Sequence, residues 1–509
     1  MEVLAVNIRA HPAIKGLLLP RAPAPLPVLS LYADDTSVIS SSDAATVAVF
    51  DTYALFEAGS GAKLNTDKCK GLWLGAWRGC LDAPVPIEWS SSKLKILGVF
   101  IGNDGVDIAN WRPRIEAVEN CLSSWRSRSL SYGGKALVVN ALALSRIWYV
   151  ASLVHMPPWV LAELNSVIFK FFWSGKRDLV ARDVVIHDHA KGGFNMVSIA
   201  FKVNALLVQW IRRYLCSPNS WVSLMTYWFF DRFGIDPLGA FSAPLPFLSA
   251  RLPPFYAAVL DAWKALDGSV STNGLVVRSV RDSIQLPASS FSCKSCYHLC
   301  LLIHPCRPHC VIKFRPSFGD LDWPSTWKSL FYMPLDRQVI DLNWKVAHGV
   351  LYTAERLSSF GYNLPTNCFC GYHMESSEHL FFSCPLIQSG IDFIQSLLFR
   401  ASPLAPSITV KHMLFGFSSD ELLCVPPVFS YLLNLCKFLV WCQRNDHRFR
   451  SVPPSALKLL ACLKSRASFY LPLFFKRFVS QRRRRYFHRQ WGANGIIGRA
   501  TDGSFNLNF

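Results

Sequence analysis

Long uninterrupted apolar runs are missing from this sequence, although 51% of its 509 residues are hydrophobic. No run reaches the roughly 18 residues that a membrane-spanning helix needs, because Asn434 and Lys437 interrupt even the richest stretch, residues 429–442. Residues 1–19 lack the charged segment and long apolar segment of a secretory signal. We therefore expect no membrane segment and no secretion, but an intracellular protein, nuclear or cytoplasmic, with several packed cores.

Acidic residues are also scarce, and 34 Asp and Glu against 53 Lys and Arg leave a net charge of +19. Such an excess favours polyanionic partners, RNA and DNA above all, although a basic surface can also serve solubility alone. The 16 cysteines are scattered rather than spaced as a small disulfide framework. We expect most of them to be reduced, buried thiols, with metal binding as the chief exception.

The first hundred residues have a strand-rich pattern. A proline-rich loop at 20–28 precedes a strand–turn–strand pattern at 29–40, and a helix is predicted at 44–58. Further short strands are predicted at 72–74 and 94–101.

From residue 111 onward, apolar residues recur at helical spacing, with breaks predicted at Gly133-Gly134 and Pro157-Pro158. Trp125 and Trp148 fall in the apolar register, so we expect them in the core. The same helices carry six interleaved cations: Arg112, Arg114, Arg126, Arg128, Lys135 and Arg146. One helix face should pack while another offers cations to phosphates, with an ordinary solvated face as the alternative.

Two adjacent aspartates, Asp34 and Asp35, occupy the turn between the strands predicted at 29–40. Adjacent carboxylates repel each other unless a cation neutralises them. Paired magnesium ions in phosphoryl transfer need such ligands. An Asp-Asp pair can also be an ordinary turn, so the pair alone does not decide.

The order of the surrounding motifs resembles the C-terminal part of a non-LTR (LINE-type) retrotransposon reverse transcriptase. The resemblance covers most of residues 1–215 and resumes at about 320–450. Its parts are, in order, Glu2 to Arg9, the Tyr32-Ala-Asp-Asp palm hairpin, Ser60 to Asn65 with Lys68, Lys95 to Val99, Trp125 to Lys135, Phe171 to Lys176, Lys191 to Asn195 and Gln209 to Arg212.

The resemblance implies an α+β fold: a partial reverse-transcriptase palm at 1–105, a helical thumb at 106–215, a connector of mixed structure at 216–319, a small zinc-binding-type module at 320–390 and a helical basic region at 391–509. It also implies RNA-directed DNA polymerase activity on a template–primer of RNA and DNA. Asp34 and Asp35 would hold magnesium (Mg2+), and Lys63 would lie near the triphosphate. Tyr32, Leu97 and Gly98 would contact nucleic acid, with Leu97-Gly98 holding the primer.

One departure from the family pattern concerns the metal ligands. The family carries a further aspartate on an earlier palm strand, whereas Glu2 is the only acid before Asp34 here. A two-ion site without that strand should bind magnesium poorly, so we expect the 509-residue chain to be inactive alone while retaining nucleic-acid-binding surfaces. A domesticated RNA- or DNA-binding protein and a pseudogene product are the alternatives.

A second candidate metal site is the C-x-C-x8-H-x4-C pattern of Cys368, Cys370, His379 and Cys384. Three thiolates and an imidazole would close a tetrahedral zinc (Zn2+) site. The pattern also resembles the C-terminal zinc-binding segment of LINE-type proteins. We interpret the nearby His373 as a turn residue. The denser cluster at residues 293–310 offers too many overlapping pairings, and we expect ordinary buried thiols there.

The C-terminal region is basic, with Arg482, Arg483, Arg484 and Arg485 in one run. Aromatic residues interleave with further basic residues around this run, among them Tyr486, Phe487 and Trp491. Such a segment can neutralise phosphates and stack on unpaired bases. A nuclear-localisation signal and a plain solvated tail remain the alternatives.

Overall fold

The computed structural model describes residues 2–18, 28–216, 221–228, 252–266, 268–271, 274–278, 283–286, 292–478, 481–501 and 504–508. The chain divides into two compact units. The first unit comprises Met1–Trp125, Ala141–Ile168 and Ser198–Pro305, and the second comprises Arg126–Asn140, Phe169–Val197 and Cys306–Phe509. Helices predominate and the sheets are small, which agrees with the predicted α+β class at this coarse level. Apart from Val28, the predicted proline-rich loop lies outside the described residues.

The N-terminal part of the first unit is built around a small apolar core. Helices α1 (Glu2–Ala10) and α2 (Asp43–Ser60) bury Leu4, Ile8 and Val49 in it. Strands β1 (Val28–Tyr32) and β2 (Asp35–Ile39) form the predicted antiparallel hairpin. The predicted helix at 44–58 is confirmed as α2. It begins after Ser42, whose side chain accepts a hydrogen bond from the Ala45 N–H, and ends at Gly61, where φ is +73°.

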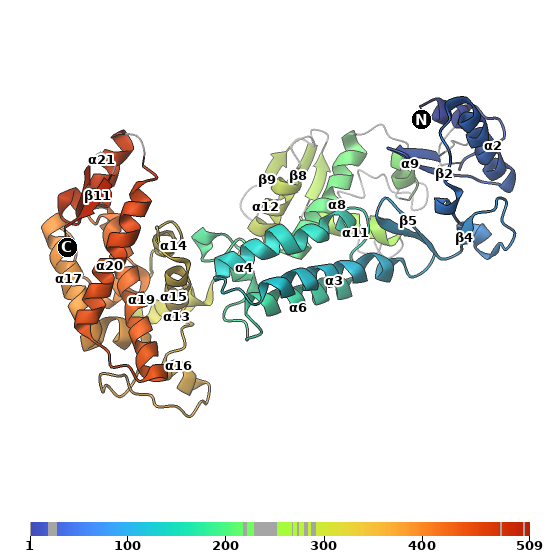
Figure 1. Cartoon of the computed structure of the whole chain (residues 1–509). Helices are drawn as coiled ribbons and strands as arrows, with labels where there is room; N and C mark the ends of the chain where they lie inside the picture. Colours follow the sequence, from blue (N-terminus) through green and yellow to red (C-terminus); the bar gives the residue numbers. More distant parts are fainter. Residues whose placement is uncertain are drawn as a thin grey trace. The chain divides into compact units, whose positions relative to one another are not determined.

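Two further strand pairs follow in the first unit (Figure 1). Strand β3 (Lys70–Leu72) pairs in parallel with β4 (Glu88–Ser90), and β5 (Lys93–Ile96) pairs antiparallel with β6 (Val99–Gly102). The segment predicted as strand at 94–101 is therefore a hairpin of two strands. Its turn consists of Leu97 and Gly98, with φ values of +47° and +83°. Strand β3 begins two residues before the predicted strand at 72–74.

Helices make up most of the remainder of the first unit: α3 (Val106–Trp125), α5 (Trp148–Ala151), the part of α6 (Pro158–Phe172) up to Ile168, α8 (Ile199–Cys216), α9 (Trp221–Thr226), α11 (Pro254–Lys264) and α12 (Cys293–Ile303). A three-stranded sheet of β7 (Gly268–Ser271), β8 (Gly274–Arg278) and β9 (Ser283–Leu286) accompanies them. Helix α6 begins at Pro158, so the predicted break there is confirmed. Trp125 and Trp148 are half-buried. Trp111, in contrast, is fully buried. Its indole N–H donates to the His155 carbonyl at 3.0 Å.

The second unit is also helical: α4 (Tyr132–Val138), α7 (Arg182–Ile186), α13 (His309–Phe318), α14 (Trp323–Phe331), α15 (Arg337–Ala347), α16 (Ala354–Ser359), α17 (Pro385–Ala401), α18 (Val410–Phe415), α19 (Pro427–Arg450), α20 (Ala456–Phe475) and α21 (Gln481–Gln490), with a hairpin of β10 (Gly498–Thr501) and β11 (Ser504–Leu507). Helices α17, α19 and α20 lie side by side, in orange and red in Figure 1, and enclose one apolar core.

The predicted break at Gly133-Gly134 is wrong, because both glycines lie inside α4. Ser131 starts this helix by accepting a hydrogen bond from the Gly134 N–H at 3.1 Å, and the interruption falls before it, at residues 126–131. Among the helices described, none is long and apolar enough to cross a lipid bilayer.

Candidate metal centre and nucleic-acid surfaces

Four predicted ligands converge in the second unit. The ligand atoms of Cys368, Cys370, His379 and Cys384 all lie within 4.8 Å of one another. The Cys370 Sγ is 3.2 Å from His379 Nε2, and the Cys368 Sγ is 4.0 Å from the Cys384 Sγ. Tetrahedral zinc with roughly 2.3 Å bonds to sulfur would separate its ligand atoms by roughly 3.5–4 Å. The four side chains therefore fit one zinc ion and would fill all its positions, as in a structural site.

A tight turn presents the first two cysteines. The Gly371 N–H donates to the Cys368 carbonyl at 3.0 Å, and the Cys368 N–H donates to the Tyr372 carbonyl at 2.8 Å. Gly371 has a φ of +90°, a conformation that costs glycine little because it has no Cβ. The close C-x-C spacing is thus accommodated by this turn, which places Cys368 inside the core and Cys370 at the surface.

The other two ligands come from the segment that leads into α17. A π-helical turn spans His379–Ser383, and the Ser376 hydroxyl accepts a hydrogen bond from the His379 N–H at 3.0 Å. Cys384 follows immediately and is the residue before the first turn of α17. Cys384 is fully buried and its N–H donates to the His379 carbonyl at 2.8 Å. Backbone bonds therefore fix both ligands relative to each other.

The protonation states of two ligands suit a metal. Burial lowers the pKa of His379, which keeps its imidazole neutral. The contact between the Cys368 and Cys384 side chains lowers the pKa of Cys384, which favours its thiolate, and raises the pKa of Cys368, which holds the proton of the pair until a metal displaces it. Neutral imidazole and thiolate are the forms that bind zinc. The Tyr372 ring, which sequence reasoning missed, stacks on His379 at 4.3 Å and 8° and restricts its orientation. His373 is exposed and lies outside the four-residue group.

Sequence reasoning also missed a buried ion pair beside this cluster. Glu375 is 2% exposed and accepts a hydrogen bond from the Ala354 N–H at 3.0 Å. Its carboxylate binds the Arg444 guanidinium at 2.5–3.1 Å and Arg448 at 3.2 Å. These charged hydrogen bonds link the loop that carries Cys368 and Cys370 to helix α19.

The two aspartates occupy the hairpin tip in the first unit. Tyr32 pairs with Asp35 across the strands, which leaves Ala33 and Asp34 as the turn, with a φ of +56° at Ala33. Both aspartates are exposed, and Lys63 is exposed in the segment after α2. Within the described residues, the Cys/His group is the one cluster of three or more potential metal ligands. No third acidic ligand thus joins Asp34 and Asp35 in this part of the chain.

Two side chains hold the Leu97-Gly98 turn. The Tyr149 hydroxyl donates to the Leu97 carbonyl at 2.7 Å, and the Arg114 guanidinium donates to the Gly98 carbonyl at 3.2 Å. The Leu97 side chain is still 43% exposed. Side chains of α3 and α5 therefore hold the backbone of this turn, while the Leu97 side chain remains accessible. Arg114 uses one of its donors for the Gly98 carbonyl.

The predicted phosphate-facing cations differ in their surroundings. Arg112 forms an ion pair with Glu163 at 2.6 Å. In the second unit, Arg126 and Arg128 are exposed in the segment before α4. The Lys135 ammonium donates to the Phe172 carbonyl at 2.9 Å and to the Ser174 hydroxyl at 2.6 Å, and burial lowers its pKa. The contact of Lys135 with nucleic acid stays a prediction, and a phosphate would compete with the Phe172 carbonyl and the Ser174 hydroxyl for its ammonium.

The run of four arginines, Arg482 to Arg485, lies near the start of helix α21. Arg483 and Arg485 are exposed and Arg484 is half-buried, whereas the Arg482 side chain lies outside the described residues. Phe487 and Trp491 are buried in the core of the second unit, packed against Phe474. The expectation that these two rings stack on bases is therefore wrong, because apolar burial already covers them.

The denser cysteine cluster contains the predicted buried thiols. Cys296, Cys300 and Cys310 are buried, and burial raises the pKa of these thiols to about 12, 11 and 12 respectively. Cys293 and Cys306 are half-buried. A raised pKa keeps the buried three as protonated, unreactive thiols.

Comparison with known proteins yields two matches. Residues 291–389 match a family described as zinc-binding in reverse transcriptase, and this segment contains all four candidate zinc ligands. The chain is also similar to the Transposon TX1 uncharacterized 149 kDa protein of Xenopus laevis. That match is 29% identical over 266 residues, which is 49% of this chain and 20% of the relative. The matched part thus spans about a fifth of the relative's length.

The two matches define a class, the reverse-transcriptase-related proteins of transposons. The chain is similar to proteins of this class, and the predicted resemblance to the C-terminal region of a non-LTR (LINE-type) retrotransposon reverse transcriptase is confirmed. The family match begins at residue 291, upstream of the zinc-binding-type module predicted at 320–390.

Proposed function

We propose that this chain is a nucleic-acid-binding part of a retrotransposon RNA-directed DNA polymerase, and that the 509 residues bind RNA and DNA without extending a primer by themselves. The observation that carries the proposal is the converged Cys3His group inside the segment that matches the reverse-transcriptase zinc-binding family. The net charge of +19 supports polyanionic partners.

The proposed metal is zinc, bound by Cys368, Cys370, His379 and Cys384. When bound, zinc would supply a covalent-like cross-link between the 368–371 turn and the start of α17, and it would leave no open position for substrate. Its role is therefore to stabilise the module. The turn and the Tyr372 ring orient the ligands around it, and the pair of Glu375 with Arg444 anchors the loop that carries Cys368 and Cys370.

The proposed palm site is incomplete within these 509 residues. Asp34 and Asp35 would bind Mg2+ at the exposed hairpin tip, with Lys63 near the triphosphate. Two-ion catalysis needs ligands that fix both metals and the nucleophile. Because two carboxylates from one turn do not supply them, we expect weak magnesium binding and no polymerisation by this chain.

The proposed nucleic-acid contacts are of two kinds. Tyr32 is exposed at the end of β1, and Leu97 and Gly98 form a hairpin turn whose Leu97 side chain is exposed, so a primer strand can approach these residues. The cationic contacts are Arg126, Arg128, Lys135, Arg482, Arg483, Arg484 and Arg485. Contacts to phosphate carry no sequence information, so binding should be nonspecific. A domesticated RNA- or DNA-binding protein would share these surfaces, and an expressed pseudogene product could retain them.

The test uses the purified 509-residue chain with labelled single-stranded RNA and DNA of unrelated sequences, titrated at several salt concentrations. We expect binding to all of them, with log K falling steeply and linearly with log[salt]. In parallel, primed RNA with magnesium and deoxynucleotides should give no extension. Absence of binding at low salt would overturn the proposed function. Extension that is lost in Asp34→Asn would overturn the proposed lack of catalysis.

A further inference from the structure

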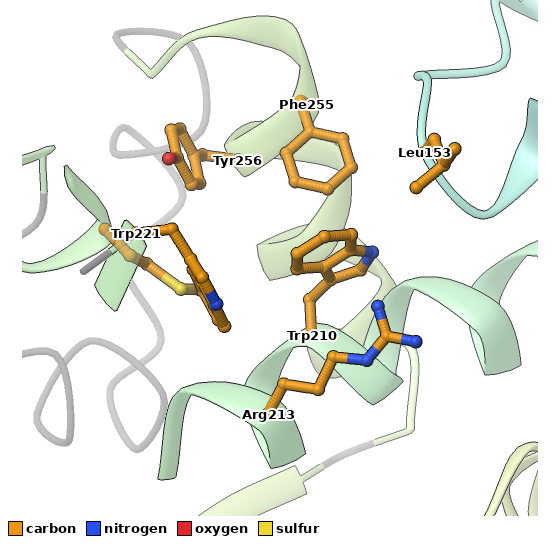
Figure 2. Close-up of a pocket in the computed structure, with 7 residues that line it drawn as sticks. Leu153, Trp210, Arg213, Trp221, Phe255 and Tyr256 are labelled. Atoms are coloured by element: carbon orange, nitrogen blue, oxygen red, sulfur yellow. The ribbon is translucent and has the colours of Figure 1, made fainter. Parts of the chain in front are cut away.

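An aromatic pocket of about 600 Å³ lies in the first unit, between residues of α8, α9 and α11 (Figure 2). Figure 2 shows the rings of Trp210, Trp221, Phe255 and Tyr256 around a common opening, with the Arg213 guanidinium beside Trp210. The size falls within the roughly 300–1,000 Å³ of small-ligand sites. The lining residues described include no acidic side chain, so the local charge suits an anionic ligand with a flat apolar part.

The central ring of the pocket is held in place. The Trp210 indole N–H donates to the Ser152 carbonyl at 2.8 Å. Trp210 makes edge-to-face contacts with Trp221 and Phe255, each with centroids 5.3 Å apart. In an edge-to-face pair, the ring that presents its edge keeps both of its faces clear of its partner. Apart from the Trp210 face that Arg213 covers, flat surfaces thus remain for stacking, and little ordering is needed on binding.

The cation is placed to bind a phosphate. Arg213 is exposed, and its guanidinium lies 4.8 Å from the Trp210 ring centroid. A guanidinium stacked on an indole keeps its N–H groups directed outward in its own plane, where phosphate oxygens can accept them. An apolar ligand would leave these donors unused, whereas a nucleotide uses both the rings and the cation.

We propose that this pocket binds one unpaired base of a single-stranded RNA or DNA, with the adjacent phosphate at Arg213. The inference rests on the proposed function and adds a site for base stacking, which the phosphate contacts of that function do not require. Every base has a flat π-face, so the pocket accepts bases with little sequence preference. Stacking of this kind strengthens binding by about five- to a hundredfold per base.

The test compares the full chain's affinity for a 16-nucleotide single strand with its affinity for the same strand carrying abasic sites. Both strands have the same phosphates. We expect wild type to prefer the base-containing strand by fivefold or more, and Trp221→Ala to remove that preference without changing the salt slope. Arg213→Gln should flatten the slope by up to about 0.7, the amount for one single-strand phosphate. The matched control is Trp77→Ala, an exposed tryptophan of the same unit.

The outcomes separate this site from the proposed function. Equal affinity of wild type for both strands, with binding retained, would overturn the pocket alone. Failure to bind either strand would overturn the proposed function as well. If Trp221→Ala does not fold, a strand containing 5-iodouridine decides on wild type: photocrosslinks to Trp221 or Tyr256 support the site, and crosslinks confined to other residues overturn it.

Discussion

Glu375 and Arg444 form a buried ion pair in the second unit, with the two carboxylate oxygens bound by the guanidinium at 2.5–3.1 Å. Their side chains are 2% and 4% exposed. Glu375 lies in the loop that carries Cys368 and Cys370, and Arg444 lies on α19. The pair therefore fixes the loop to the core beside the candidate zinc ligands, independently of any metal.

Removing both partners of this pair should cost less stability than the sum of the losses when each partner is removed alone. Arg444→Met leaves the Glu375 carboxylate buried with incomplete compensation, so we expect the free energy of unfolding to fall by about 3–5 kcal/mol. The double variant Glu375→Gln/Arg444→Met should lose clearly less than the sum of the single variants. Urea unfolding of the four proteins measures this coupling.

The matched control is Arg450→Met on the same helix. Arg450 is 76% exposed and pairs only at the surface with Asp446, and the loss should stay within about 0.5 kcal/mol. Additive losses in the double variant would show that the two charges do not stabilise each other.

A second prediction concerns zinc. The full chain should bind one zinc per molecule, and cobalt substitution should give thiolate charge-transfer bands. Cys384→Ser should lower Tm in the zinc-loaded protein much more than in the chelated protein, because structural zinc contributes to folding. Cys384 is buried, so a metal-independent loss is expected in addition, and the difference between the two states is the readout.

The control for zinc is Cys121→Ser, a half-buried cysteine of α3. It should leave the metal content and the zinc-dependent part of Tm unchanged. A wild-type protein without zinc after loading, or one whose zinc content survives Cys384→Ser, would return the four residues to ordinary buried side chains.

The elements that could be predicted from sequence are those fixed by neighbouring residues. Helix α2 follows from its apolar pattern, its Ser42 cap and Gly61. The Tyr32–Asp35 hairpin follows from two β-rich arms around a turn. The four candidate zinc ligands lie within 17 residues, and their spacing was enough to bring them together.

The features that could not be predicted depend on distant partners. Glu375 and Arg444 are 69 positions apart, and neither residue type signals a buried pair by itself. Gly133-Gly134 suggested a break because glycine disfavours helix, yet the Ser131 cap and burial of Gly134 outweigh that local preference. The sequence suggested that Phe487 and Trp491 were available for base stacking, but both rings are buried in the core of the second unit. Packing, which a single sequence does not display, decided each case.

A third prediction is a pH dependence caused by Lys437 of α19. Lys437 is 2% exposed, and burial lowers the pKa of its ammonium to about 7. In the unfolded chain the pKa is about 10.4. Between pH 7 and 10 the unfolded chain therefore binds more protons, and the free energy of unfolding should rise with pH across this window. Burial raises the pKa of the neighbouring Cys436 thiol to about 12, so it stays neutral there.

The comparison of Lys437→Met with wild type isolates this effect. At pH 7 the variant should be more stable by on the order of 1–3 kcal/mol, because it removes a buried charge, and the advantage should shrink toward pH 10. Urea midpoints at pH 7, 8.5 and 10 measure it. The exposed Lys458→Met is the control and should show no such trend. A constant difference across pH would show that Lys437 is not the titrating group.

The last prediction concerns the basic run at the start of α21. Replacing Arg482, Arg483, Arg484 and Arg485 by Gln should flatten the slope of log K against log[salt] by up to roughly three, because each neutralised phosphate of a single strand contributes about 0.7. Unrelated RNA and DNA sequences should be weakened about equally, since phosphate contacts do not read bases. The matched control replaces the same four residues by Lys, which keeps the charge and should keep the slope. A localisation signal predicts unchanged binding in vitro and an altered distribution between nucleus and cytoplasm. If the Gln variant keeps both slope and affinity, the run is not the contact surface, and Arg126 and Arg128 become the next residues to replace.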